Sequence, residues 1–176
     1  MSPLLVPETR PSTVALFPFH ARHVRAAIHE AKYHGSTLAF NLLAAALTDY
    51  LLDADDLPAS KSKRVLIPIP LGRERQKGRG FNQTEEVARR ALEELEMTVD
   101  VTLLTRTRET GSQVGLPREK REQNMQGAFK AVRRVDPAST YIVFDDVITT
   151  GATLQAAVLA LRDAGAKHII PLALAH

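Results

Sequence analysis

The stretch YIVFDDVITTGATLQAAVLALRDAGA, residues 141–166, decides the fold of this chain. It opens with a nearly continuous apolar run, which is typical of a parallel strand buried on both faces. Apolar residues then recur at helical spacing until Gly165, a residue that commonly ends helices. A second apolar run at 168–175 predicts another strand, and the order strand, helix, strand predicts a right-handed crossover in a parallel sheet. The predicted fold class is therefore α/β.

The residues before this stretch predict further helices and strands around the same sheet. Periodic apolar residues predict helices over 21–33, 37–52 and 82–95. Apolar, β-branched runs predict strands at 64–70 and 99–104. A polar connector at 53–63 separates a helical N-terminal portion, 1–60, from an α/β core, 64–176. At 176 residues, the chain has the length of one ordinary domain, so both parts are expected in a single domain, 1–176.

Composition excludes several classes of protein. The chain contains no Cys, which rules out disulfide frameworks, Cys-ligated zinc and thiol nucleophiles. Hydrophobic residues make up 44% and charged residues 24%, which is the usage of a globular domain rather than a disordered one. The first residues lack the pattern of a secretory signal, and no apolar run is long enough to cross a membrane. We therefore expect a cytoplasmic protein without a membrane partner.

Positive charge is concentrated in two segments of the chain. Residues 61–90 carry nine Lys and Arg against three Glu, and residues 101–135 carry eight against three. The whole chain has a formal net charge of only +3, so the remaining residues are net acidic. The two basic segments suit a polyanion such as pyrophosphate or nucleic acid, or else form solvated faces and loops.

The turn that follows the strand at 141–146 has the composition of a sugar phosphate site. Ligands of open parallel sheets bind beyond the carboxyl ends of the strands, and here Asp145 and Asp146 stand at that end. Gly151 permits a tight turn, three Thr hydroxyls can donate, and the following helix offers free N–H groups to a phosphate. The alternative is a plain turn with N-capping Thr residues and a solvated acidic pair. The spacing matches neither a Walker loop nor a GxGxxG turn.

The stretch FDDVITTGATL resembles the signature of type I phosphoribosyltransferases, which bind 5-phosphoribosyl 1-pyrophosphate (PRPP). The resemblance implies a parallel-sheet phosphoribosyltransferase fold with a flexible hood loop. It implies that Asp145 and Asp146 hold the ribose hydroxyls, and that the following residues complete the PRPP site and bind its 5-phosphate, namely Val147, Ile148, Thr149, Thr150, Gly151, Ala152 and Thr153. Mg²⁺ is expected to be carried by PRPP and water, with Asp145 and Asp146 able to meet the ion.

Two longer stretches are similar to the competence-associated ComF branch of that superfamily. They are IPIPLGRERQKGRGFNQTEEVA and TRTRETGSQVGLPREKREQNMQGAF, and VRAAIHEAKYHG adds a weaker match. The resemblance covers about residues 20–175. Many members of the branch begin with a Cys-rich zinc module, which this sequence does not contain, so partner binding through that module is in doubt.

The resemblance also assigns roles to the basic segments. The pyrophosphate loop is expected at Pro68, Ile69, Pro70 and Leu71. The cations just beyond it, at positions 73, 75, 77 and 79, either serve this loop or lie in a solvated loop. Arg79 is expected to face the pocket while Phe81 packs as an anchor. For Asn82, capping of the next helix is a sufficient role.

The segment 105–125 corresponds to the hood loop that closes over the substrate. Closure of a basic loop excludes water, and its Arg residues can neutralise charge that accumulates on pyrophosphate. Arg118 and Arg121, spaced as one helical face, are the favoured catalytic cations beside Arg79. Lys32 also matches a position of the family, although a solvated Lys explains it equally well. His20 and His23 are spaced three apart, but no His pair is assigned as a metal site.

Two hypotheses for function follow. The favoured one is an enzyme that transfers phosphoribosyl from Mg²⁺-bound PRPP to a base or amine with release of pyrophosphate. The alternative is a non-catalytic PRPP sensor whose basic segments bind single-stranded DNA or a partner in the DNA-uptake machinery, although the scarcity of aromatic residues counts against direct DNA binding. The superfamily often dimerises, so a homodimer is one expectation.

Overall fold

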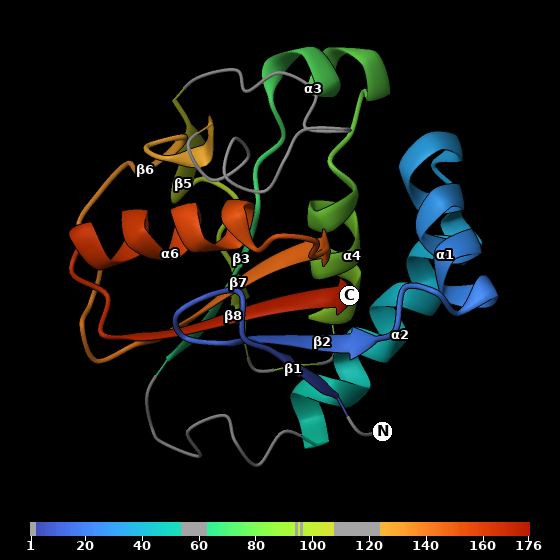
Figure 1. Ribbon diagram of the computed structural model, residues 1–176, viewed down its shortest axis with the longest axis horizontal. Coiled ribbons are helices and arrows are strands. Elements are labelled where there is room, and N and C mark those ends of the chain that lie inside the picture. Colours follow the sequence, from blue (N-terminus) through green and yellow to red (C-terminus); the bar gives the residue numbers. More distant parts are fainter. Residues whose placement is uncertain (1–2, 54–62, 94, 96, 108–123) are drawn as a thin grey trace.

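The sheet of the computed structural model is mostly parallel, as the sequence predicts (Figure 1). The structure describes residues 3–53, 63–93, 95, 97–107 and 124–176. Six strands pair side by side in the order β1 (Leu4–Val6), β2 (Thr13–Phe17), β8 (His168–Ala175), β7 (Thr140–Val147), β3 (Arg64–Pro68) and β4 (Thr98–Val99). Within this six-stranded sheet of the described residues, only the β1–β2 pair is antiparallel. The α/β class is confirmed.

Strand β7 is central because it is apolar on both faces. It pairs in parallel with β3 on one side and with β8 on the other. Ile142, Val143 and Phe144 are fully buried, which is the burial expected of a parallel strand covered by helices on both faces. The carboxylates at the end of β7 therefore stand on a strand that packing holds rigidly.

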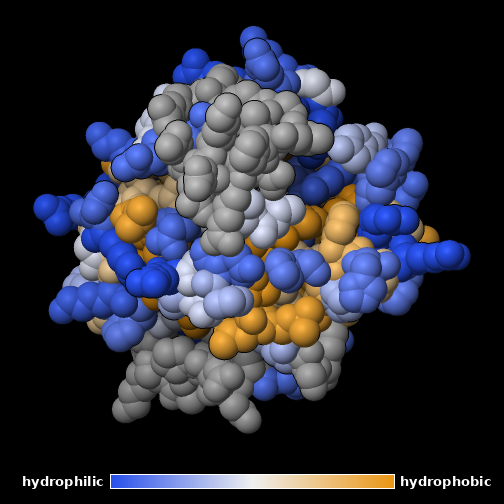
Figure 2. All heavy atoms as spheres, in the orientation of Figure 1, coloured by the Kyte–Doolittle hydropathy of each residue, from blue (hydrophilic) through white to orange (hydrophobic). Residues whose placement is uncertain are grey.

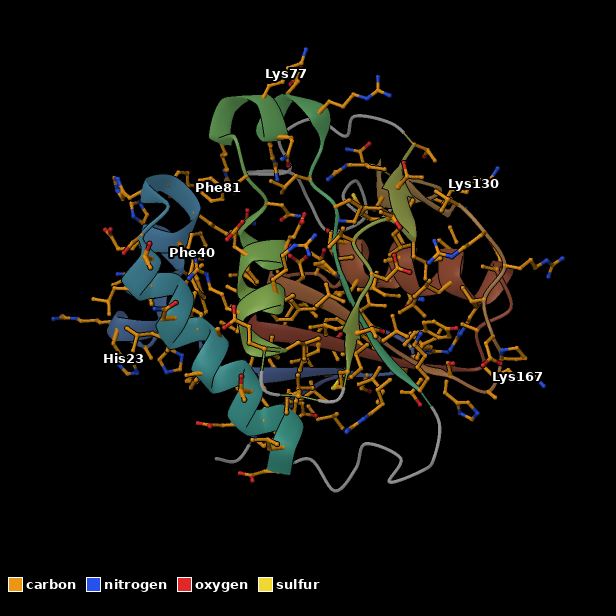
Figure 3. All side chains as sticks on the ribbon, turned by 180° about the vertical axis from the view of Figure 1, so that it is seen from behind. His23, Phe40, Lys77, Phe81, Lys130 and Lys167 are labelled. Atoms are coloured by element: carbon orange, nitrogen blue, oxygen red, sulfur yellow. The ribbon has the colours of Figure 1, made fainter. Side chains whose placement is uncertain are left out.

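Helices cover the two faces of the sheet in separate layers (Figures 1 and 3). Helix α6 (Ala152–Asp163) packs on one face, against a core that includes Val143 of β7. The other face carries α1 (Arg22–His29), α2 (Thr37–Asp53) and α4 (Gln83–Ala91), whose core includes Phe144. Neighbouring residues of β7 thus reach opposite layers, as the alternation of a strand requires.

The sequence predicted a purely helical N-terminal portion, 1–60, and this was wrong because the portion also contains strands. Residues 4–6 and 13–17 form β1 and β2, and β2 pairs in parallel with β8, the last strand of the chain. Leu4 and Leu5 of β1 are exposed, and Figure 2 shows apolar surface where β1 lies in Figure 1. These strands are too short to show a clear apolar alternation, and the Pro and polar residues at 7–12 interrupt the pattern between them.

The predicted helices form with small differences at their ends. Helix α1 continues into a π-helix, η1 (Glu30–His34), which ends at Gly35 with a φ of +60°. Asn82 caps α4 as predicted, but the helix ends at Ala91 and not at about 95. The segment that the sequence suggested as a loop, 73–79, is instead a short helix without buried residues, α3 (Arg73–Arg79).

The predicted strand at 99–104 was wrong. Strand β4 ends at Val99, and a separate two-stranded sheet is formed by β5 (Leu104–Arg106) and β6 (Phe129–Ala131). The Asp100 carboxylate causes the break, since its Oδ1 accepts hydrogen bonds from the backbone N–H groups of Thr102 and Leu103. Such an Asp turn competes with a strand for the same backbone groups.

Candidate functional site

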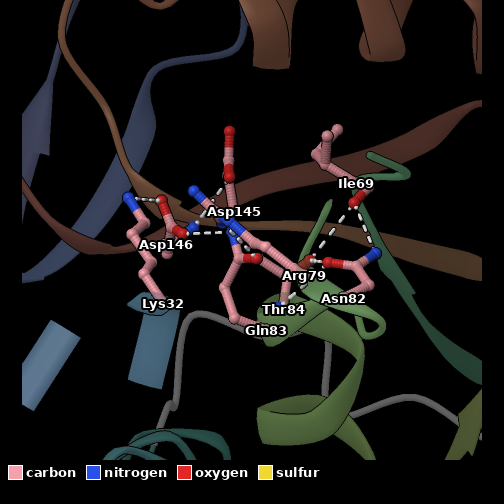
Figure 4. A network of polar contacts seen from close by, with 8 residues as sticks. All are labelled: Lys32, Ile69, Arg79, Asn82, Gln83, Thr84, Asp145 and Asp146. Carbon is pink, nitrogen blue, oxygen red and sulfur yellow. Dashed lines mark hydrogen bonds and ion pairs between the residues drawn. The ribbon is translucent and has the colours of Figure 1, made fainter. Parts of the chain in front are cut away.

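The carboxyl ends of β3 and β7 and the start of α6 meet at one edge of the sheet. This is the edge at which open parallel sheets bind ligands. Asp145 and Asp146 are successive residues of β7, so their side chains leave the strand on opposite faces (Figure 4). They have different surroundings, and the sequence expectation treated them as one pair.

Asp146 is tied to the helical layer that carries α1 and α4. Its Oδ1 lies 2.8 Å from Nζ of Lys32, and its Oδ2 accepts a hydrogen bond of 2.6 Å from the Gln83 amide. Asp146 is only 6% exposed. Lys32 therefore neutralises a buried carboxylate and is more than a solvated surface Lys.

Arg79 belongs to the same polar network, next to Gln83 (Figure 4). Its guanidinium donates to Oε1 of Gln83 at 2.9 Å and lies over the ring of Tyr33, 5.2 Å from the centroid. Phe81 packs as the predicted anchor, edge-on against Phe40 with ring centroids 5.7 Å apart (Figure 3). A methyl group on Gly35 would stand 3.3 Å from the Phe81 ring, so this glycine makes room for it.

Asn82 does more than cap α4. Its side chain oxygen accepts from the Thr84 N–H, and its amide nitrogen donates to the carbonyl of Ile69 at 3.0 Å. The Thr84 hydroxyl donates to the same carbonyl at 3.2 Å. The start of α4 thus holds the predicted pyrophosphate loop, which the sequence did not reveal.

The predicted pyrophosphate loop, Pro68 to Leu71, offers few N–H groups. Pro68 and Pro70 have none, and the N–H of Ile69 donates to the Phe144 carbonyl at 2.9 Å. Among the described residues, no acceptor lies within hydrogen-bond distance of the Leu71 N–H. Leu71 lines a cavity of about 330 Å³ together with Pro70, Arg73 and Arg106. Two cations therefore flank this turn.

Asp145 keeps partial exposure on the face opposite to Asp146. Its Oδ1 accepts the backbone N–H of Asp146 at 2.8 Å. Burial, in the first place, and the charge of Asp146, in the second, raise the pKa of Asp145 to about 7. The backbone N–H of Asp146 and the charges of Lys32 and Arg106 oppose this rise. Its protonation state therefore changes near neutral pH.

The first two residues after the acids, Val147 and Ile148, contact strand β8. Val147 pairs with Ala175 of β8, and Ile148 donates its N–H to the Ala175 carbonyl at 2.9 Å. The Ile148 side chain is 4% exposed and lies in the core beneath α6. The Ile148 N–H is thus engaged by β8, and the part of Val147 and Ile148 in a PRPP site stays a prediction.

The Thr-Gly turn leads into the N-terminus of α6. Thr149 is exposed, Thr150 is half-buried, and the Thr150 hydroxyl lies 3.5 Å from the N–H of Ala152. Gly151 has a φ of +74°, a conformation that glycine adopts without strain. The first backbone bond of α6 is donated by Gln155, so the N–H groups of Ala152, Thr153 and Leu154 have no acceptor within the helix.

The β1–β2 loop packs against this turn, and the sequence analysis missed it. A methyl group on Gly151 would come within 2.9 Å of Thr9 and 3.0 Å of Glu8. The N–H of Arg10 donates to Oε1 of Gln155 at 2.7 Å. A cavity of about 420 Å³ lies here, lined by Glu8, Arg10, Thr150, Ala152, Gln155 and neighbouring residues. One side of the predicted 5-phosphate site is thus formed by residues that are far away in the sequence.

Arg106 reaches this site from β5. Its guanidinium lies over the Phe129 ring, 5.6 Å from the centroid, and its charge acts on Asp145. Arg118 and Arg121, the favoured catalytic cations, lie outside the described residues, as does most of the predicted hood. Among the described residues of the 105–125 segment, which are 105–107 and 124–125, Arg106 is the basic residue, and its charge reaches Asp145.

Proteins of known name are similar to this chain. Competence protein F of Haemophilus influenzae is 34% identical over 119 residues, which are 66% of this chain and 52% of that protein. DNA utilization protein YhgH of Escherichia coli K12 is 31% identical over 140 residues, 79% of this chain and 61% of that protein. The chain is a homologue of competence protein F and YhgH. The resemblance to the ComF branch is thereby confirmed, and the chain spans between half and two thirds of the length of these relatives.

Two other comparisons add less. No family model matches the chain. Among solved structures, a hypoxanthine phosphoribosyltransferase from Staphylococcus aureus aligns with 77% of this chain and 61% of its own, at 11% identity and a TM-score of 0.44. In the part of the chain that the structure describes, no helix has both the length and the apolar character needed to cross a membrane.

Proposed function

We propose that this chain binds PRPP at the end of β7 and transfers its phosphoribosyl group to a nitrogen acceptor. The observation that carries the proposal is the position of Asp145, a partly exposed carboxyl at the end of a buried parallel strand. The first N–H groups of α6, which have no acceptor within the helix, lie on one side of it along the chain, and the charge of Arg106 acts on it. A sugar with phosphates at both ends needs this combination of groups.

Each part of PRPP has a matching group. The 5-phosphate is assigned to the N-terminus of α6 at Ala152 and Thr153, where N–H groups and the helix dipole favour an anion. The ribose hydroxyls are assigned to Asp145, which accepts their hydrogen bonds once it is ionised. The pyrophosphate is assigned to the cavity of Leu71, Arg73 and Arg106.

Asp146 has a different role in this proposal. Both of its oxygens are already held, one by Lys32 and the other by Gln83, so it is a positioning residue. It fixes the end of β7 against α4, and it donates its backbone N–H to Asp145. The expectation that both acids hold the ribose is thus narrowed to Asp145.

The reaction needs positioned charge rather than a protein nucleophile. The nitrogen lone pair forms a bond to C1 of the ribose while the bond from C1 to the pyrophosphate oxygen breaks, and its electron pair leaves with pyrophosphate. An acceptor N–H proton is released to solvent. Negative charge grows on the leaving group, where Arg73 and Arg106 stabilise it from the same cavity.

The residues present fit Mg²⁺ bound through water and substrate. Asp145 has the oxygen donors that Mg²⁺ prefers and partial exposure, whereas the oxygens of Asp146 are engaged by Lys32 and Gln83. Bound Mg²⁺ would neutralise charge on the substrate phosphates. Asp145 would orient such an ion through its water shell.

The first experiment tests binding. PRPP with Mg²⁺ is expected to raise the melting temperature of the full chain, and Asp145→Asn is expected to abolish the increase. Asp163→Asn, at the exposed end of α6, is the matched control and keeps the increase. No increase for the unaltered chain, or an increase that survives in Asp145→Asn, contradicts the proposed site.

The second experiment tests catalysis. Release of pyrophosphate from PRPP is followed with a panel of nucleobases and amines. Release with one acceptor class, lost on Arg106→Ala, supports the enzyme. Binding of PRPP without release across the panel contradicts the transfer reaction and favours a non-catalytic PRPP sensor.

A second candidate is a binding protein that acts on DNA. The relatives are named for competence and DNA utilization, and a cavity of about 550 Å³ between β6 and α6 is lined in part by Lys130, Arg133 and Arg134. Arg133 pairs with Asp100, so Lys130 and Arg134 are the cations to test. Single-stranded DNA binding that weakens steeply with salt and with Lys130→Ala and Arg134→Ala together supports this candidate. Its absence at low salt rejects direct DNA binding.

A further inference from the structure

We infer that the π-helix η1 carries a zinc-type metal site made by His29, Glu30 and His34. These three side chains lie on the outer surface of the α1–η1 segment, and one ligand atom from each lies within 4.8 Å of the other two. Among the described residues they form the one group of three or more metal-ligating side chains that converges in this way. The site is separate from the end of β7.

The π-helix brings the two His residues together. In an α-helix, residues five apart point about 140° away from each other, because each turn takes 3.6 residues. In a π-helix, hydrogen bonds close between residues five apart, so His29 and His34 lie one above the other. The N–H of Gly35 donates to the Glu30 carbonyl, which is this π-type bond. Their ring centroids are 5.6 Å apart.

The donor atoms need only a small adjustment to share one ion. Nε2 of His34 lies 4.0 Å from Oε1 of Glu30, and ligand atoms around tetrahedral zinc stand about 3.4 Å apart when each bond is about 2.1 Å. All three side chains are exposed, so rotation about their own bonds can close this gap without disturbing the core.

The donor set selects the class of metal. Two imidazoles and one carboxylate suit Zn²⁺, Co²⁺ or Ni²⁺, whereas Mg²⁺ prefers an all-oxygen shell. Three protein ligands leave a fourth position of the tetrahedron for water. The site therefore takes a transition metal that the PRPP site does not require.

Lys32 lies between Glu30 and His34 and projects inward to Asp146, so a metal on the outer face would brace the turn that holds this ion pair. Tyr33 belongs to the same turn. Its ring lies 4.7 Å from that of His29 and beneath the Arg79 guanidinium. Metal binding is thus expected to stiffen η1 and raise the melting temperature of the chain.

The test is a calorimetric titration of the full chain, without an affinity tag, with ZnCl₂ in 5 mM Mg²⁺. One site is expected, and His29→Ala and His34→Ala are each expected to weaken it about tenfold or more, since one of three ligands is lost. Glu30→Gln weakens it less. His23→Ala is the matched control, since His23 is exposed on α1 outside the cluster (Figure 3). It binds as the unaltered chain does.

Cobalt gives an independent readout. Co²⁺ bound by this set in a tetrahedral arrangement absorbs visible light, and ZnCl₂ is expected to remove the absorption. Failure of the unaltered chain to bind Zn²⁺, or binding by His29→Ala and His34→Ala that equals the control, overturns the inference. The titration contains no PRPP, so failure of the proposed function leaves its result unaffected.

Discussion

Asp145 and Asp146 are neighbours in β7, yet the two faces of the sheet treat them differently. Asp146 faces the α1 and α4 layer, where Lys32 and Gln83 satisfy both of its oxygens. Asp145 faces the other side, accepts one backbone N–H and keeps partial exposure, and its pKa is raised to about 7.

The two carboxylates therefore differ in how they affect the stability of the fold and in whether they can bind a ligand. A carboxylate that is paired and buried stabilises the fold only while its partner remains, because the lone charge is expensive to bury. A carboxylate that is partly buried and has few hydrogen-bond partners lowers the stability of the folded protein when it is ionised, and it can still bind a ligand. The following substitutions sharpen or break this distinction, in order of expected effect.

Asp146→Ala is expected to lower the free energy of unfolding by about 3 kcal/mol, because it leaves Lys32 partly buried without a counter-charge. Chemical denaturation measures the loss. The control is Glu85→Ala, which removes the exposed pair with Arg89 and costs about 0.5 kcal/mol. Equal losses in both variants would show that the Asp146 network contributes no more than a surface pair.

Gly151→Ala is expected to cost about 2 kcal/mol, since alanine is strained at a φ of +74° and its methyl group would strike Glu8 and Thr9. Gly78→Ala is the control, because a methyl group there meets nothing within 4 Å. It should leave stability unchanged or raise it. A tolerated Gly151→Ala would mean that the β1–β2 loop does not pack on the turn.

Asp145→Asn is expected to stabilise the ligand-free protein by about 1 kcal/mol at pH 8. The raised pKa means that the folded protein binds this proton more tightly than the unfolded chain does. The stability that Asp145 gives when protonated is therefore lost as the pH rises from about 3.8 to about 7. The melting temperatures of the two proteins, plotted against pH, should separate over this pH range and stay apart above it. Parallel curves would contradict the raised pKa.

Glu8→Gln is expected to stabilise the protein by about 0.5 kcal/mol, the smallest effect here, because Oε2 of Glu8 is buried without a hydrogen-bond partner among the described residues. It also removes a negative charge from the cavity beside Thr150, so any phosphate bound at α6 should bind more tightly. Glu93→Gln, at an exposed position, serves as the control. Weaker phosphate binding in Glu8→Gln would show that the carboxylate assists the ligand.

The sequence predicted the elements that are long and strongly periodic. The apolar run of β7, the amphipathic pattern of α6 and the Asn82 cap each fix local structure through their own residues. It did not predict β1 and β2, since strands of three and five residues gain stability from pairing rather than from their own pattern: β1 pairs with β2, and β2 pairs with β8. It also did not predict that the strand ends before Asp100, because this depends on hydrogen bonds from backbone N–H groups to the Asp100 carboxylate.

The candidate site was predicted in its location and only in part in its geometry. Alternation along a strand places Asp145 and Asp146 on opposite faces, but sequence alone does not reveal which face holds a counter-charge. Lys32 and Gln83 meet Asp146 through tertiary packing of η1 and α4. The grouping of His29 with His34 was hidden for a related reason, because a π-turn is not indicated by apolar spacing.

The pairing of β2 with β8 joins the two ends of the described chain, residues 13–17 with residues 168–175. During synthesis, β2 leaves the ribosome before β8, which emerges about 150 residues later, or about 8–30 s at ordinary translation speeds. The loop that buttresses Gly151 can settle only after that closure. Pairing of β2 thus waits for the synthesis of β8, and the turn at Gly151 is among the last parts of this sheet to settle.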